Sequence, residues 1–321
     1  MSIIVPVYNI EEEIGDCLAS LVKQTYTHLQ IILVNDGSTD RSLLICQKWA
    51  KKDPRILVVD QENSGQADAR NKGLEYATGK WIAMIDGDDY VREDYISKMV
   101  SVAEKYKVQL VNCGCKYIEG ENETALPAID SEKLLSEDEF WLLYFKGRNY
   151  RGNYQAPWGK LYSKDIFDSG IRYKKGIIHE DLDILYDLIR TAQSIVIIPD
   201  LLYYYRQRGN STTHKINQSR KVDFQMLEVV ERLYKNFLKD RKYRLGKYEL
   251  EENINLLCYY IYASNLTLSD IKKLKHTQLF LEENSQLLKE KGYPIKKSFI
   301  LKLRLFTLWC VISKVKSIIK K

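Results

Sequence analysis

Short apolar runs alternate with amphipathic stretches along roughly the first 115 residues. This alternation is typical of a parallel sheet with helices on its faces. We expect strands at Ser2–Val7, Gln30–Asn35, Ile56–Asp60, Trp81–Ile85 and Gln109–Cys113. We expect helices at Glu11–Gln24, Thr39–Lys51, Gln66–Ala77 and Arg92–Tyr106, the second of them capped by Ser38 or Thr39. The spacing of these elements suits right-handed crossovers between parallel strands.

The periodicity weakens over residues 116 to about 155 and then returns. Ser163–Ser169 and Asp181–Arg190 have helical patterns, and Ile195–Ile198 has the pattern of a buried strand. From about residue 216 the pattern is one of long helices without clear strands. The sequence therefore predicts an α/β domain over residues 1–215, with halves that meet near residue 115, and a smaller helical region over residues 216–321.

The segment Phe299–Lys321 predicts a basic amphipathic helix. Apolar side chains recur at steps of three and four and so share one helical face: Leu301, Leu305, Leu308, Ile312, Val315 and Ile319. No acidic residue follows Glu290, whereas lysine and arginine are frequent. Such a helix either packs its apolar face on protein, including a second copy of the chain, or lies on a membrane surface.

Composition limits the class of protein. With 45% hydrophobic and 29% charged residues and a net charge of +6, the chain resembles an ordinary globular protein. No apolar run approaches the ~20 residues that span a bilayer, so we expect any membrane contact to be peripheral. The first strand begins at once, without a signal-peptide pattern, and the cysteines lack the spacing of a zinc or redox site. We therefore expect a cytoplasmic protein with reduced thiols.

The most informative polar cluster is Asp86-Gly87-Asp88-Asp89, directly after the predicted strand Trp81–Ile85. Ligands of open α/β sheets bind at this carboxyl end. If the segment is extended, Asp86 and Asp88 point to one side and Asp89 to the other. Two such carboxylates repel each other unless a cation joins them, and Mg²⁺ or Mn²⁺ suits a site that also receives a diphosphate. The alternative is a polar turn that caps the next helix.

Other polar groups are expected at the same edge of the sheet. Asp36, in Asn35-Asp36-Gly37-Ser38, can accept hydrogen bonds from a nucleobase or ribose, although this segment also fits an ordinary strand-to-helix turn. Tyr8, after the first strand, can lie against a base. Arg70 offers a cation near a phosphate or ribose, or is a surface charge.

Two later segments are candidates for catalysis. His179-Glu180-Asp181 opens a helix, so its carboxylates either cap that helix or act on substrate. We select Asp181 as a general base toward an acceptor hydroxyl, with Glu180 positioning it or contacting acceptor. The stretch Tyr203–His214 is expected to be a mobile loop in which Arg206, Arg208 and His214 stabilise a leaving diphosphate, the alternative being a solvated loop. No glycine-rich phosphate motif is present, so diphosphate binding must rest on metal and cations.

Taken together, these motifs resemble the family 2 glycosyltransferases of the GT-A fold, above all bacterial enzymes of capsular, cell-wall or exopolysaccharide assembly. The resemblance covers about the first 215 residues and rests on motifs that occur in the family's order: Ile3–Asn9, Asn35–Ser38, Gly65–Asn71 with Ala69-Arg70-Asn71, Asp86–Asp89, Trp158–Tyr162 and Glu180-Asp181. One departure is Asn35, where the family commonly has aspartate.

The resemblance implies an inverting transfer of a hexose or N-acetylhexosamine from a UDP-sugar to a hydroxyl of a glycan or lipid-linked saccharide. It makes residues 1–115 the nucleotide-sugar-binding half and residues 116–215 the acceptor-binding half. Asp88 and Asp86 would hold Mn²⁺ or Mg²⁺, and Asp181 and Glu180 would be catalytic. The nucleotide-sugar site would comprise Pro6, Tyr8, Asn9, Asp36, Arg70, Asp86, Gly87, Asp88, Arg206 and His214.

Three partners and two competing functions accompany this interpretation. We expect a UDP-sugar donor, a saccharide acceptor and the inner face of the cytoplasmic membrane, with a homodimer left open and nucleic acid excluded. A nucleotidyltransferase is the first competitor, but it would usually carry a glycine-rich phosphate loop near the first strand. The second is a sugar-nucleotide-binding protein without turnover, against which Asp86, Asp88 and Asp181 argue.

Overall fold

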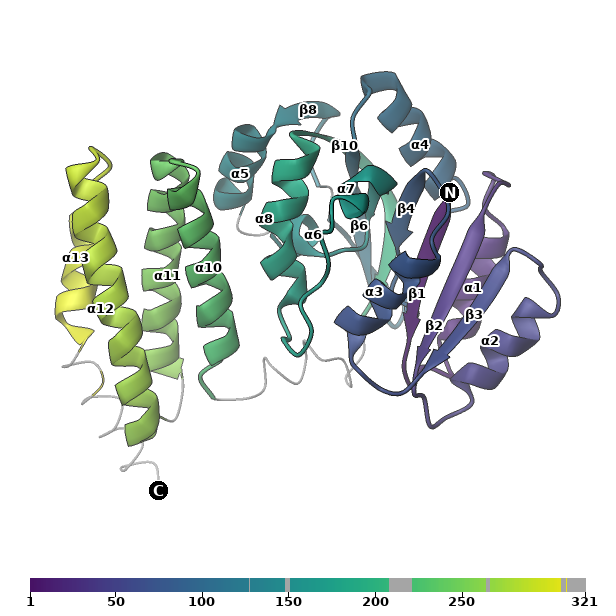
Figure 1. Cartoon of the computed structure of the whole chain (residues 1–321), viewed down its shortest axis with the longest axis horizontal. Helices are drawn as coiled ribbons and strands as arrows, with labels where there is room; N and C mark the ends of the chain where they lie inside the picture. Colours follow the sequence, from purple (N-terminus) through teal and green to yellow (C-terminus); the bar gives the residue numbers. More distant parts are fainter. Residues whose placement is uncertain (127, 148–150, 208–220, 264–265, 307–309, 311–321) are drawn as a thin grey trace. The chain divides into compact units, whose positions relative to one another are not determined.

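The computed structural model describes residues 1–126, 128–147, 151–207, 221–263, 266–306 and 310 (Figure 1). The chain divides into two compact units, Met1–Arg208 and Gly209–Lys321. The predicted boundary after residue 215 lies between residues 208 and 220, outside the described residues.

The first unit is built on one mixed sheet of ten strands among the described residues. Its main path has the order β3-β2-β1-β4-β9-β6-β10-β5, while β7 pairs with β6 and β8 with β10. The strands are β1 (Ser2–Val7), β2 (Gln30–Asp36), β3 (Ile56–Gln61), β4 (Trp81–Met84), β5 (Tyr90–Val91), β6 (Leu110–Glu119), β7 (Asn122–Leu126), β8 (Lys133–Ser136), β9 (Lys160–Ser163) and β10 (Ser194–Arg206). The strands β1 to β4 run parallel, and β9 enters antiparallel between β4 and β6.

Helices cover the sheet as the periodicity of the first half predicts (Figure 1). They are α1 (Ile14–Val22), α2 (Ser42–Ala50), α3 (Gln66–Tyr76), α4 (Tyr95–Tyr106), α5 (Glu137–Lys146), α6 (Arg151–Gln155), α7 (Lys164–Asp168) and α8 (Glu180–Ala192). All six residues of β1 are buried, and α1 covers them with Ile14, Leu18 and Leu21. This burial on both faces explains why the central strands are continuous apolar runs instead of alternating ones.

Two local predictions are wrong. The helix α2 begins at Ser42, because Ser38 and Thr39 instead bond to Asn9: the Asn9 N–H donates to Ser38 Oγ at 3.2 Å, and the Thr39 N–H donates to Asn9 Oδ1 at 2.8 Å. The stretch Tyr203–His214 is predicted to be a mobile loop, but its first residues, Tyr203 to Arg206, belong to the strand β10. There β10 pairs with β6 and, at Tyr203 and Tyr204, also with β5.

The second unit is helical throughout its described residues, as predicted. It contains α10 (Phe224–Lys239), α11 (Tyr243–Ala263), α12 (Leu268–Glu290) and α13 (Lys297–Arg304), which lie side by side in Figure 1. Leu274, Leu281 and Leu288, spaced seven apart on α12, are fully buried in its core.

The buried face of α13 differs from the predicted apolar stripe. Leu301 is 56% exposed and Leu305 is half-buried, whereas Leu303 and, after α13, Phe306 and Cys310 are each 3% exposed and join the core of the second unit. The other face is therefore the one that packs on protein. The remaining stripe positions Leu308, Ile312, Val315 and Ile319 lie outside the described residues. Among the helices of the described residues, none has the length and apolar character needed to cross a membrane.

Candidate active site

The acidic motif after β4 forms a tight turn. The Asp89 N–H donates to the Asp86 carbonyl at 3.0 Å, so the extended geometry expected for this motif is wrong. Gly87 packs against the end of β1 and the loop after it: a Cβ atom would lie 2.9 Å from the Pro6 carbonyl oxygen and 2.5 Å from Ile10 Cδ1. Only glycine permits this approach, and it brings the motif beside the predicted nucleotide-binding residues that follow β1.

Asp89 is a buried structural member of this turn. Its side chain is 1% exposed and accepts hydrogen bonds from the Tyr203 hydroxyl at 2.7 Å and the Arg206 N–H at 2.8 Å. Burial raises the pKa of Asp89, and the charges of Asp88 and Asp86 raise it further. The turn is thus fastened to the end of β10, while Asp86 and Asp88 remain half-buried.

Asp86 and Asp88 are the carboxylates of the acidic turn that could hold a metal ion. Asp86 Oδ1 accepts hydrogen bonds from Arg70 Nη2 at 2.9 Å and Gln66 Nε2 at 3.2 Å. The described residues contain no group of three or more histidine, cysteine, aspartate or glutamate side chains arranged to hold a metal. Mg²⁺ commonly uses only one or two protein carboxylates and takes its other ligands from substrate phosphates and water. Two carboxylates with hard oxygen donors meet that pattern.

Arg70 joins the acidic turn to the start of α8. Its side chain, on α3, is 2% exposed, and Nη1 donates to Glu180 Oε1 at 2.7 Å while Nη2 donates to Asp86. Burial alone would lower the pKa of Arg70, but Asp86 and Glu180 raise it above its ordinary value. The alternative of a surface charge is therefore wrong, and Arg70 is a buried cation between two carboxylates.

Glu180 and Asp181 occupy the first turn of α8, where the helix dipole stabilises negative charge. Burial raises the pKa of Glu180, and Arg70 opposes that effect. Burial also raises the pKa of Asp181, against the N–H of Leu182, which donates to Asp181 Oδ1 at 2.8 Å, and the charge of Arg70. A carboxylate whose pKa is raised is a better proton acceptor, which suits a general base.

Asp36 holds the loop between β3 and α3. It is 3% exposed, and its Oδ1 accepts hydrogen bonds from Gln61 Nε2 at 2.8 Å and the Ser64 N–H at 2.9 Å, while Oδ2 accepts the Gly65 N–H at 2.8 Å. These bonds hold the loop before α3, the positive φ of Gly37 fits a turn after β2, and the contact between Asp36 and a nucleobase stays a prediction. Tyr8, predicted to lie against the base, is 50% exposed.

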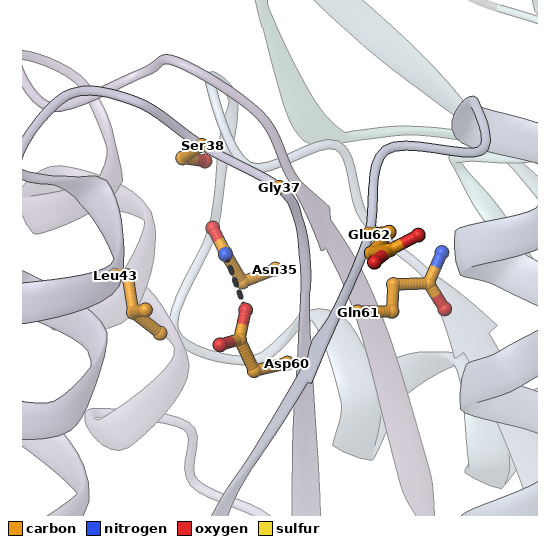
Figure 2. A pocket seen from close by; sticks show the side chains of 7 residues that line it. All are labelled: Asn35, Gly37, Ser38, Leu43, Asp60, Gln61 and Glu62. Carbon is orange, nitrogen blue, oxygen red and sulfur yellow. Dashed lines mark hydrogen bonds between the residues drawn. The ribbon is translucent and has the colours of Figure 1, made fainter.

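A cavity of about 440 Å³ opens at the carboxyl ends of β2 and β3 (Figure 2). Its lining residues are Asn35, Gly37, Ser38, Leu43, Asp60, Gln61 and Glu62. Asn35 Nδ2 donates a hydrogen bond to Asp60 Oδ1 at 2.7 Å. An aspartate at position 35, which the resemblance leads one to expect, would instead repel the Asp60 carboxylate. Asp36 does not line this cavity. The sequence did not point to Asp60 or Glu62, because they lie in an ordinary strand end.

Arg206 lies at the end of β10, next to the acidic turn. Its Nη2 donates to Asp16 Oδ2 at 2.8 Å, and its guanidinium carbon lies 5.5 Å from the centre of the Tyr90 ring. Its backbone bond to Asp89 places it at the expected edge of the sheet. His214 and Arg208, the other predicted diphosphate contacts, lie outside the described residues.

Sequence reasoning missed the individual roles of Trp158 and Lys160. The Trp158 ring stacks on Tyr203, with 4.6 Å between ring centres. Lys160, on β9, is 1% exposed and its Nζ donates to the carbonyls of Asn153, at 2.9 Å, and Ala156. Burial lowers the pKa of Lys160 to about 7. The available signal was a lysine that begins a short strand, two residues after Trp158, in a segment where a buried lysine is rare.

Several known proteins are similar to this chain. An "uncharacterized glycosyltransferase EpsJ" of Bacillus subtilis is 34% identical over 216 residues, which are 66% of this chain and 62% of EpsJ. "Glycosyltransferase GlyA" of Streptococcus pneumoniae is 30% identical over 221 residues, 66% of this chain and 31% of GlyA. The matched regions thus span less than two thirds of both relatives.

Solved structures show the same fold. The S. aureus TarS fragment 1–349, crystallised in complex with UDP-GlcNAc, superimposes with a TM-score of 0.69 and 18% identity over 98% of this chain and 89% of that fragment. This likeness identifies the first unit's sheet and helices as the GT-A fold. The sequence pattern of the family described as "Glycosyl transferase family 2" matches residues 2–170, more than half of the chain. Because that match covers most of the first unit and more than half of the chain, the chain belongs to glycosyl transferase family 2.

Proposed function

We propose that the protein transfers a hexose or N-acetylhexosamine from a UDP-sugar to a hydroxyl of a glycan or lipid-linked saccharide during surface polysaccharide synthesis, with inversion at the anomeric carbon. One observation carries this proposal. Arg70 bonds both Asp86 and Glu180, so the residue before Asp181 lies one side chain away from the acidic turn. A donor diphosphate at the turn and an acceptor hydroxyl at Asp181 would then be neighbours.

The residues divide the chemistry between them. Asp181 takes the proton of the acceptor hydroxyl as its oxygen bonds to the anomeric carbon, and the bond from that carbon to the UDP oxygen breaks. Arg206, beside the acidic turn, supplies positive charge toward the departing diphosphate. Asp86 and Asp88 would hold Mn²⁺ or Mg²⁺, which would neutralise charge on the diphosphate. Tyr8 and Asp36 would contact the base, and Pro6 and Asn9 would shape its binding site.

The names of similar proteins support a UDP-sugar as donor and a cell-surface polymer as acceptor. The TarS fragment was crystallised with UDP-GlcNAc, and GgaB of Bacillus subtilis, described as a minor teichoic acid biosynthesis protein, is 37% identical over 112 residues. These names favour a UDP-sugar donor and an acceptor in cell-surface polymer synthesis.

The uneven charge of the chain favours a peripheral membrane partner. Residues 209–321 hold 23 of the 49 lysines and arginines but only 11 of the 43 aspartates and glutamates, a net charge of +12, whereas residues 1–208 carry −6. Basic segments bind the anionic cytoplasmic face of a membrane. We therefore include in the proposal that residues 209–321 hold the enzyme at that surface, where a lipid-linked acceptor would be met.

Binding of nucleotide sugars tests the proposal. Thermal shifts are measured with UDP-, GDP-, CDP- and TDP-sugars, each with and without Mn²⁺, for the wild type and Asp88→Asn. Asp94→Asn, in the same region but after the turn, is the matched control. We expect one UDP-sugar to raise Tm only with Mn²⁺ and only when Asp88 is intact. Stabilisation by another nucleotide class, or equal stabilisation of Asp88→Asn, would contradict the donor and metal assignments.

A further inference from the structure

Three residues within one turn of α3, Asp68, Arg70 and Asn71, fasten the segment that leads into α8. Asn71 exchanges two hydrogen bonds with the backbone of Tyr173: Nδ2 donates to the carbonyl at 2.8 Å, and the Tyr173 N–H donates to Oδ1 at 2.9 Å. Asp68 pairs with Lys175. Arg70 reaches Glu180, and its guanidinium carbon lies 5.5 Å from the Tyr173 ring centre. We call these contacts, between residues 68–71 and 173–180, the α3 clamp.

Arg70 has no free edge for a nucleotide. Its two terminal nitrogens bond Glu180 and Asp86, its buried Nε has no hydrogen-bond partner among the described residues, and 2% of the side chain is exposed. A phosphate or ribose could replace one of these carboxylates only by leaving it buried and unpaired, which is strongly unfavourable. This geometry argues against direct contact with the donor.

The same geometry places Arg70 between the acidic turn, where the donor is proposed to bind, and the start of α8, which carries the proposed base. Asp86 belongs to the turn after β4, and Glu180 begins the helix whose next residue is Asp181. More than one hundred residues separate Arg70 from Glu180 along the chain, so their relative position depends on such long-range contacts. Gln66 Nε2 also donates a hydrogen bond to Asp86 Oδ1, at 3.2 Å. Among the described contacts, Arg70 is the only side chain that donates to the Glu180 carboxylate. Loss of Arg70 would therefore disturb α8 more than the acidic turn.

We propose that Arg70 is a positioning residue that fixes the Asp181 end of α8 against the acidic turn, and that it does not bind the donor. The catalytic part of this inference rests on the proposed glycosyl transfer, while the clamp itself is a property of the fold. A displacement of about 1 Å at a reacting group can cost roughly 10²-fold in rate. Arg70 would accordingly act on kcat and leave nucleotide affinity in place.

The test compares Arg70→Met, Arg70→Lys, Glu180→Gln and the double variant Arg70→Met/Glu180→Gln in the full chain. Lys72→Met is the control, because Lys72 lies on the same helix and its contacts, an ion pair with Glu75 and a cation–π contact with Tyr76, are both with exposed residues. Three quantities are measured: kcat and donor KM, UDP affinity by calorimetry with Mn²⁺, and amide hydrogen exchange over residues 173–185.

We expect Arg70→Met to lower kcat about 10²-fold and to change the UDP Kd by less than about 3-fold. Exchange should accelerate over residues 173–185 and not in β1–β3. Arg70→Lys should recover at least about tenfold in kcat by keeping a buried cation, and the double variant should be no slower than Arg70→Met because both changes break one contact. The control should match the wild type.

Two results would overturn the inference separately. A UDP Kd weakened more than about tenfold at unchanged kcat would make Arg70 a nucleotide ligand instead. Unchanged exchange over residues 173–185 in Arg70→Met would remove the clamp, whether or not any sugar is transferred. Should the wild type transfer no sugar, the proposed function fails, and the exchange comparison still decides the clamp. If Arg70→Met does not fold, Arg70→Lys and Glu180→Gln decide it by the same two readouts.

Discussion

The hydroxyl of Tyr203 donates a hydrogen bond to Asp89 Oδ2 at 2.7 Å and accepts one from the Asp86 N–H at 3.2 Å. One phenol thereby fixes both ends of the acidic turn. Tyr203 is fully buried: Trp158 stacks on its ring, and the Tyr95 ring meets it edge-on with 6.5 Å between ring centres. The geometry of the turn depends on this contact.

Tyr203→Phe removes the hydroxyl and leaves the ring. We expect the free energy of unfolding to fall by about 1–3 kcal/mol, since a buried carboxylate loses one of its hydrogen bonds. UDP affinity should weaken as well, because the turn loses an anchor. Urea denaturation and calorimetry measure the two effects. Tyr204→Phe is the control, because the Tyr204 hydroxyl makes no hydrogen bond among the described residues; equal effects of both variants would disprove the special role of Tyr203.

Asp181→Asn preserves size and removes the proposed base. We expect kcat to fall by about 10²–10⁴-fold, the usual contribution of a general base, with UDP affinity unchanged. Initial rates with the donor identified by thermal shift provide the measurement. Asp183→Asn, in the same helical turn, is the control and should stay within about 3-fold of the wild type. Normal turnover by Asp181→Asn would exclude Asp181 from the mechanism.

The pH dependence of the reaction follows from the surroundings of Asp181. Burial raises its pKa above the ordinary 3.8, while the positive groups that face it, Arg70, His179 and Lys160, limit that rise. A base works only when deprotonated, so the rate must fall as the pH drops through this raised pKa. We expect the acidic limb of kcat/KM to lie above pH 3.8, and Asp183→Asn to keep it there. A rate that stays constant down to pH 3.8 in folded protein would contradict the assignment.

The sequence predicted β1 to β4 to within one residue at each end, because their apolar runs follow a local pattern. It ended the next predicted strand at Cys113, whereas β6 continues to Glu119, and it did not predict β5. It could not predict that β9 enters antiparallel between β4 and β6, since these pairings join segments that are far apart along the chain. The site divides in the same way. Asp86, Asp88 and Asp181 were found from motifs, but the burial of Arg70 depends on partners that only the folded chain brings together.

Lys160 should make stability depend on pH. Its pKa is about 7 in the folded protein and about 10.5 when unfolded, so between these values the unfolded chain binds more protons. Stability therefore rises with pH over this interval, by up to about 1.4 kcal/mol per pH unit for one group. We expect the unfolding free energy of the wild type, relative to that of Lys160→Met, to rise by about 2 kcal/mol from pH 7.5 to 9. A constant difference would show that Lys160 stays charged when folded.

Membrane attachment is best tested by charge, because truncation would damage the fold. Deleting Phe299 onward would remove Leu303, Phe306 and Cys310 from the core of the second unit. Changing Lys314, Lys316, Lys320 and Lys321 together to glutamine removes only positive charge from the basic end. Each lysine near an anionic surface contributes about 1 kcal/mol, so we expect binding to weaken up to about 10³-fold.

Co-sedimentation with vesicles that contain anionic lipid gives the measurement, with neutral vesicles and high salt as reference conditions. The control changes four exposed lysines of the first unit to glutamine: Lys23, Lys48, Lys51 and Lys52. Because both variants lose the same total charge, a loss of binding confined to the first one locates the membrane contact at the basic end. Equal loss in both would instead make the attraction a property of net charge, and no loss in either would contradict electrostatic attachment through these lysines.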